Sequence, residues 1–207
     1  MKRMTKYQKI YAICGLAGPI VFNLIWIIAG FIQPGYNHIR DDVSSLMALG
    51  APNKLLFDSM NIASFVLEII FFIGLILVIK ELKGSIVGPA ILLSGKILGI
   101  IVPIFFPLNY GGLPTGFTGT MHLIIVMITG FIALGGMIAM WRGLRKVDEW
   151  NGYDMYSLIT FIVTLVVTML LVFAAGTEVM GLVERLVIIA NGQYTFILAL
   201  KTFRSSD

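Results

Sequence analysis

The chain has 207 residues, of which 58% are hydrophobic and only 13% are charged, and its mean hydropathy is +0.94. Water-soluble domains contain about 45–50% apolar and about 25% charged residues, so this composition excludes a water-soluble globular domain and indicates a membrane protein. The single cysteine, Cys14, excludes an internal disulfide. With only two histidines beside it, the sequence predicts neither a metal site nor a cofactor.

Six segments are long and apolar enough to cross a bilayer, which takes about 20 residues of helix. No linker divides them, so the sequence predicts an all-α fold, a single six-transmembrane-helix bundle over residues 1–207. The basic N-terminus resembles the start of a signal peptide. However, the apolar stretch behind it is too long for one and lacks a cleavage site, so we expect the first span to be retained. The predicted spans are 10–32, 55–79, 86–106, 120–141, 155–176 and 182–203.

The distribution of Lys and Arg between the spans predicts the orientation of the bundle. The two termini and the second and fourth connections together carry eleven basic residues, whereas the first connection carries only Arg40 and Lys54 and the third and fifth carry none. Because basic residues are retained in the cytoplasm, we expect both termini to be cytoplasmic in a multi-pass protein of the cell membrane. The same retention accounts for the net charge of +4 without a nucleic-acid partner.

The first outer connection carries a helical pattern of its own. Apolar side chains recur from Ile39 to Met47 at the spacing i, i+4, i+7 and i+8, and Gly50 with Pro52 forms a stop signal. This spacing predicts a short amphipathic helix on the outer membrane surface. Its polar arc contains Arg40, Asp41, Ser44 and Ser45.

A polar stripe runs down one face of the second span, at Asp58, Asn61, Ser64 and Glu68. Polar groups on a span rarely face lipid, because they would lose water without gaining a partner. The stripe is therefore expected to face protein or a water-filled cavity. It ends at mid-depth, since the helix beyond Glu68 is apolar.

Lys96 of the third span lies at about the same depth as Glu68 of the second, since each is roughly 16–18 Å from the inner end of its helix at ~1.5 Å per residue. An unpaired charge at mid-bilayer costs about 2.5–3.5 kcal/mol, so we predict that Glu68 and Lys96 form a buried ion pair. Two roles remain open for it, a structural pair that fixes helix register and a proton or ion relay. Asn23 and Asn191 belong to the same polar layer.

Two later spans add polar groups near the outer surface. An uncharged loop rich in glycine and proline leads to His122 at the outer end of the fourth span. Glu184 and Arg185 lie one turn inside the sixth, where Glu178 or Asp58 could pair with Arg185. The polar and charged side chains, which are energetically unfavourable within a membrane, thus gather in the outer half of the bundle. The sequence predicts an outward-facing polar pocket lined by Tyr36, Arg40, Asp41, Ser44, Asp58, Asn61, His122, Glu184 and Arg185.

Three segments carry a family resemblance: PGYNHIRDDVSSLMALGAPN, FPLNYGGLPTGFTGTMH and GLVER. They resemble a bacterial and archaeal family of six-span membrane proteins that contain a domain of unknown function. Asn109 stands where that family often has an acid, so the resemblance supplies no metal-binding carboxylate in this loop. It implies a six-span fold with an outer pocket and brings no established activity. The family motifs fall on Pro34, Tyr36, Ser44 or Ser45, Phe106, Pro107, His122, Gly181 and Arg185.

Three functions fit these residues, and the sequence leaves open whether the protein is an enzyme. The first is binding of a lipid headgroup or small amphiphile, with Arg40 and Arg185 holding phosphate or carboxylate. The second is a small secondary transporter or proton-coupled carrier, with the polar stripe as its path and Lys96 as its gate. The third is a metal-assisted membrane lipid hydrolase, with His38, His122 and an Asp as ligands. Membrane lipids are the expected partners in each case.

Overall fold

The computed structural model describes residues 6–111, 114 and 116–204, and it is all-α, as the sequence predicts. Each of the six long helices is long and apolar enough to cross a membrane, so the chain is a multi-pass membrane protein. The long helices are α1 (Lys6–Ile32), α2 (Lys54–Glu81), α3 (Val87–Phe105), α4 (Gly116–Leu144), α5 (Tyr153–Ala174) and α6 (Met180–Arg204). Two short 3-10 helices lie in the connections, η1 (Ser44–Met47) and η2 (Asp148–Trp150).

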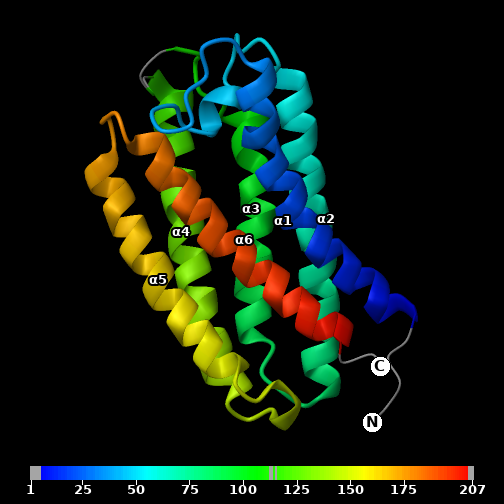
Figure 1. The fold of residues 1–207 in the computed structure, drawn as a ribbon. Helices are drawn as coiled ribbons and strands as arrows, with labels where there is room; N and C mark the ends of the chain where they lie inside the picture. Colours follow the sequence, from blue (N-terminus) through cyan, green and yellow to red (C-terminus); the bar gives the residue numbers. More distant parts are fainter. Residues whose placement is uncertain (1–5, 112–113, 115, 205–207) are drawn as a thin grey trace.

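The six helices form a closed ring in chain order (Figure 1). Each helix packs mainly against its neighbours in the sequence, and α6 packs against α1 to close the ring. The start of α1 meets the end of α6, where Lys9 Nζ lies 5.9 Å from the ring centroid of Phe203. A ring of six helices is wider than a four-helix bundle, so side chains must fill its centre or leave a cavity there.

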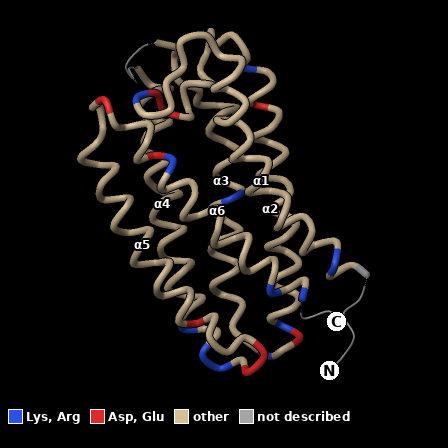
Figure 2. Tube along the Cα trace, viewed as in Figure 1, with Lys and Arg blue, Asp and Glu red and all other residues tan. Residues whose placement is uncertain are grey.

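The two ends of the ring differ in charge. We call the end that carries the α1–α2, α3–α4 and α5–α6 connections the outer end, and the opposite end the inner end. Most of the basic residues in the described part of the chain lie at the inner end (Figure 2). Lys2 and Arg3 of the basic N-terminal cluster lie outside the described residues. Lys96 stands apart from the basic residues of the inner end, at the middle of α3.

The inner half of the ring is filled by apolar side chains. Four helices and the α4–α5 connection contribute to one buried cluster, in which the aromatic rings of Phe71, Phe72, Trp150 and Tyr194 are at most 1% exposed. The cluster also contains Leu75, Ile79, Leu92, Met137, Met140, Leu144, Val147, Leu198 and Ala199.

Small residues allow the helices to approach closely in this half. A Cβ atom at Gly88 of α3 would lie only 2.7 Å from the backbone nitrogen of Met140 in α4. Backbone cannot move aside as a side chain can, so Gly88 sets the α3–α4 separation.

We predict that Gly88→Val lowers the free energy of unfolding by about 1–3 kcal/mol, because the added side chain must push α3 away from α4. Gly135→Val is the matched control, because a Cβ at Gly135 of α4 meets no atom within 4 Å. Denaturation by sodium dodecyl sulfate in mixed micelles measures both variants. Equal stabilities for the two variants would contradict the close approach at Gly88.

Candidate functional site

A cavity of about 300 Å³ occupies the ring between the outer end and the apolar cluster, and all six helices contribute to its wall. Its outer end is lined by Val43, Ser44 and Met47 of the α1–α2 connection. Its inner end is lined by Phe72 and Tyr194 of the buried cluster. We call it the central cavity.

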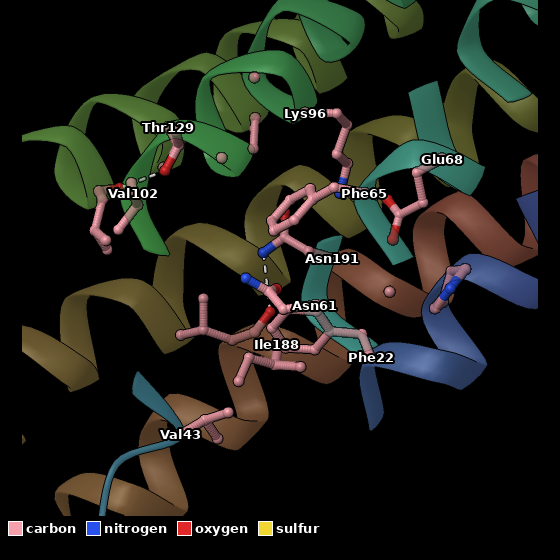
Figure 3. Close-up of a pocket in the computed structure, with 18 of the residues that line it drawn as sticks. Phe22, Val43, Asn61, Phe65, Glu68, Lys96, Val102, Thr129, Ile188 and Asn191 are labelled. Carbon is pink, nitrogen blue, oxygen red and sulfur yellow. Dashed lines mark hydrogen bonds and ion pairs between the residues drawn. The ribbon is translucent and has the colours of Figure 1, made fainter. Parts of the chain in front are cut away.

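The predicted ion pair lies in the wall of the central cavity. Lys96 Nζ of α3 is 2.5 Å from Glu68 Oε2 of α2, and the two side chains are 20% and 5% exposed. The ammonium group also lies 5.9 Å from the ring centroid of Phe65, and Thr195 of α6 donates a hydrogen bond of 3.5 Å to Glu68. The close-up in Figure 3 shows the Lys96 side chain reaching from α3 toward Glu68 and Phe65. The pair thus joins three helices at mid-depth.

Three asparagines line the same cavity but differ in their hydrogen bonds. The amide nitrogens of Asn23 and Asn191 each donate to a carbonyl of their own helix, those of Pro19 and Val187, at 2.8 and 2.9 Å. Asn61 is only 3% exposed, and its Oδ1 has no hydrogen-bond partner among the described residues. A buried carbonyl oxygen without a donor costs about 1–3 kcal/mol, which a bound ligand could offset.

Residues 33–53 and 106–111 form a cover over the outer end of the ring, which we call the outer cap. Its two segments are joined by backbone hydrogen bonds, from Leu49 N to Leu108 O at 2.7 Å and from Tyr110 N to Leu49 O at 3.0 Å. The His122 ring, which lines the central cavity, contacts the cap through Nδ1 and the Phe106 carbonyl at 2.8 Å.

Arg185 of α6 fastens the outer cap to the ring. Its guanidinium donates to the carbonyls of His38 and Asp41 at 2.7 and 3.0 Å, and to the hydroxyl of Tyr36. It also lies 5.6 Å from the ring centroid of Trp26 and 5.4 Å from that of Tyr36. Arg185 is 4% exposed, so it acts within the protein as a cation held by carbonyl dipoles and aromatic faces.

The same end of α6 explains why the predicted amphipathic helix is shorter than expected. Only Ser44–Met47 is helical, as the 3-10 helix η1. The carbonyls of Ile39 and Arg40 accept hydrogen bonds from the α6 amides of Leu182 and Gly181. Backbone groups that a continuous helix would pair internally are therefore bound by α6 instead. The apolar spacing predicts the burial of three of its four residues, since Val43, Leu46 and Met47 are buried. The fourth, Ile39, is 52% exposed.

The structure divides the nine predicted pocket residues into two groups. Ser44, Asn61, His122 and Glu184 line the central cavity. The remaining five are absent from its wall, and all take part in charged or hydrogen-bonded contacts at the outer end: Tyr36, Arg40, Asp41, Asp58 and Arg185.

The ion pairs of the outer end also differ from those expected for Arg185. Asp58 pairs with Lys54 one turn before it in α2. Asp41 pairs with Arg40, whose Nε lies 2.7 Å from Asp41 Oδ1. Arg185 therefore binds neither Asp58 nor Glu178, because backbone carbonyls of the cap lie within reach of its guanidinium.

Sequence reasoning missed the glycines that make room for the cavity. Gly95 and Gly99 of α3 and Gly130 of α4 line its wall. A Cβ at Gly130 would meet no atom within 4 Å, so this position faces open space. The only sequence signal was the placement of Gly99 and Pro103 on the helix face of Lys96.

Burial within the outer cap shifts the pKa values of three titratable groups. It raises the pKa of the Tyr36 hydroxyl, even though the nearby Arg185 charge opposes the shift. It likewise raises the pKa of the Asp42 carboxyl. For His38, burial and the positive charge of Arg185 both lower the pKa. The cap is thus built to hold His38 in its neutral form.

We predict that Arg185→Lys loosens the outer cap, because lysine cannot bind several carbonyls in one plane. Losing one charged hydrogen bond costs roughly 2 kcal/mol, so backbone amides of residues 38–43 should exchange hydrogen on the order of thirtyfold faster. Arg40→Lys is the control, since Arg40 is exposed and pairs only with Asp41 among the described residues. Unchanged exchange in Arg185→Lys would contradict the fastening role.

The His38 shift predicts a pH dependence of stability. The folded protein binds the His38 proton less tightly than the unfolded chain, so the unfolded chain holds more protons below pH about 6.5. Stability is therefore complete above that pH and falls as the pH decreases through it. Melting temperatures in nanodiscs at a series of pH values should decline less steeply for His38→Phe, which keeps an aromatic ring beside Trp26 and Tyr36. Identical slopes would remove His38 as the cause.

In a comparison with known protein families, residues 16–201 match the family described as protein of unknown function (DUF998). No curated protein and no solved structure matches the chain. The matched region runs from the first turns of α1 to the last turn of α6, so it includes the outer cap and every residue that lines the central cavity. This agrees with the family resemblance of the three sequence segments, and the chain belongs to the DUF998 family of proteins of unknown function.

Proposed function

We propose that this membrane protein binds a lipid headgroup or small amphiphile in the central cavity. The observation that carries the proposal is a cavity of about 300 Å³ inside the ring, whose wall includes Asn61, a buried side chain with an unpartnered Oδ1 among the described residues. Ligand pockets are typically about 300–1,000 Å³. The volume is at the lower limit of that range, so it suits a headgroup or a single short chain better than a whole two-chain lipid.

The wall of the cavity has the mixed character that an amphiphile needs. Apolar side chains such as Phe22, Phe65 and Ile188 face the same space as Asn61 and Asn191 (Figure 3). Apolar walls favour an alkyl chain through burial, at about 25 cal/mol per Å². Polar groups placed among them orient the other end of the ligand.

The expected roles of Arg40 and Arg185 change under this proposal. Arg40 pairs with Asp41, and Arg185 is bound to cap carbonyls and Tyr36. The charge of Arg185 therefore holds the cap to α6, whereas Arg40 makes its ion pair within the cap. The contacts to ligand fall to groups that line the wall, among them Ser44, Asn61, His122 and Glu184.

The two alternative functions have less support. A carrier needs a path through the inner half, where the apolar cluster packs against the end of the cavity. A metal-assisted hydrolase needs a ligand set. In the part of the chain that the structure describes, no three His, Cys, Asp or Glu side chains lie close enough together to hold a metal ion.

We further propose that the protein lies in the cell membrane with both termini in the cytoplasm. The gathering of basic side chains at the inner end supports this orientation. The outer cap and the nearer end of the cavity would then lie on the external side.

We predict that Gly130→Leu abolishes binding, because the new side chain enters the cavity without meeting any atom at its Cβ. Gly135→Leu is the matched control: it makes the same change in the same helix, also in open space, but away from the cavity wall. The measurement is mass spectrometry of lipids and small molecules that co-purify with each protein. A species retained by wild type and Gly135→Leu but absent from Gly130→Leu is expected. The same set from all three proteins would contradict binding in the cavity.

A further inference from the structure

We propose that the ligand of the central cavity carries a primary ammonium group on a short apolar chain, with Glu184 as its counter-ion. The inference rests on the proposed function and assigns the ligand class of that site. It follows from an imbalance in the described part of the cavity wall, which offers several hydrogen-bond acceptors and one carboxylate with no Lys or Arg at ion-pair distance, whereas its one basic group is already paired.

The basic groups near the cavity are already paired. Lys96 is the only Lys or Arg in the described part of the wall, and its ammonium lies 2.5 Å from Glu68. Arg185 directs its guanidinium into the outer cap, and it does not line the cavity. A phosphate or carboxylate ligand would have to break the Glu68–Lys96 pair and leave a buried carboxylate unpaired, which is strongly unfavourable.

The acceptors, in contrast, have spare capacity. Asn61 Oδ1 lacks a donor within the described residues. The carbonyl of Gly99 loses its usual helical donor four residues on, because that residue is Pro103, and both residues line the cavity. A ligand that donates hydrogen bonds satisfies these groups, whereas a ligand that only accepts leaves them unsatisfied.

Glu184 adds a negative charge to this wall. One carboxylate oxygen accepts a hydrogen bond of 2.6 Å from the Val43 amide. No Lys or Arg nitrogen in the described part of the chain lies within ion-pair distance of Glu184, and the charges of Asp42 and of its chain neighbour Arg185 act on it in opposite senses. With Glu68 and Lys96 paired, Glu184 is the remaining carboxylate of the described wall. An ammonium group provides both the donors and the opposite charge.

The test compares three probes with the same alkyl chain, octylamine, 1-octanol and octanoate, by their effect on the melting temperature in phosphatidylcholine nanodiscs. Octylamine should stabilise wild type at about tenfold lower concentration than 1-octanol, because a charged hydrogen bond replaces a neutral one. Octanoate should have no effect. All shifts should vanish in Gly130→Leu and persist in Gly135→Leu.

Glu184→Gln tests the contribution of the negative charge alone, because glutamine is neutral but has nearly the same size as glutamate. Its amide oxygen can still accept from Val43, so the cap contact is kept, while the preference for octylamine over 1-octanol should disappear. If this variant does not fold, the ranking of the three probes on the wild-type protein still tests the ammonium inference. Octanoate binding as well as octylamine, with both lost in Gly130→Leu, would overturn the ammonium inference and leave the cavity function standing. Shifts that are the same in wild type and Gly130→Leu would overturn binding in the cavity itself.

Repeating the octylamine series in phosphatidylethanolamine nanodiscs identifies the source of the ammonium group. A weaker octylamine effect there means that the lipid headgroup competes for the site, and an unchanged effect means that a free amine is the ligand. Both results retain the ammonium class.

Discussion

The contact of Arg185 with the backbone of the outer cap is the interaction on which the rest of this structure depends. A guanidinium that is 4% exposed satisfies two cap carbonyls at once, and the amides of Gly181 and Leu182 satisfy two more. These carbonyls come from a segment with little regular structure of its own, so α6 supplies the donors that a helix or strand would otherwise provide. The cap stays closed because one helix end supplies the donors that the loop lacks.

The groups in the wall of the central cavity act in the low-dielectric surroundings of the protein interior. Glu68 and Asn61 are only 4% and 3% exposed, so a charge or an unpaired dipole there acts more strongly than at a surface. The Glu68–Lys96 pair, the free oxygen of Asn61 and the carboxylate of Glu184 therefore weigh more in ligand choice than their number suggests. The same side chains on a water-exposed loop would discriminate only weakly between ligands, because water screens their charges.

Glycine has opposite effects in the two halves of the ring. In the inner half, Gly88 and Gly136 let α3 and α4 approach until a Cβ at either position would meet the other helix at 2.7 or 2.6 Å. In the outer half, Gly130 has no neighbour within 4 Å and leaves space instead. The difference lies in what stands opposite each glycine, since Gly88 faces Met140 and Gly136 faces Leu92, whereas Gly130 faces the central cavity.

The number of spans, the all-α class and the depth of Glu68 and Lys96 could be predicted from the sequence because they depend on local composition and on a fixed rise per residue. The outer cap could not. The pattern from Ile39 to Met47 has helical spacing, but the backbone there is held by α6, about 140 residues further along the chain. For the same reason Arg185 was expected to pair with an acid, when carbonyls brought near by folding bind it instead. The local sequence pattern identifies polar and charged residues whose burial in a membrane costs free energy. Only the tertiary contacts decide which of these residues line a cavity.

The closure of the ring by α1 and α6 has a consequence for chain connectivity. Because every helix contacts its sequence neighbours and the first contacts the last, the six helix pairings form a closed cycle that does not depend on where the chain starts. Lys9, near the start of α1, already contacts Phe203, near the end of α6. A short linker there, with new ends opened in the α2–α3 or α4–α5 connection, gives a circular permutant in which all six pairings survive and both new ends emerge on the same side of the bilayer.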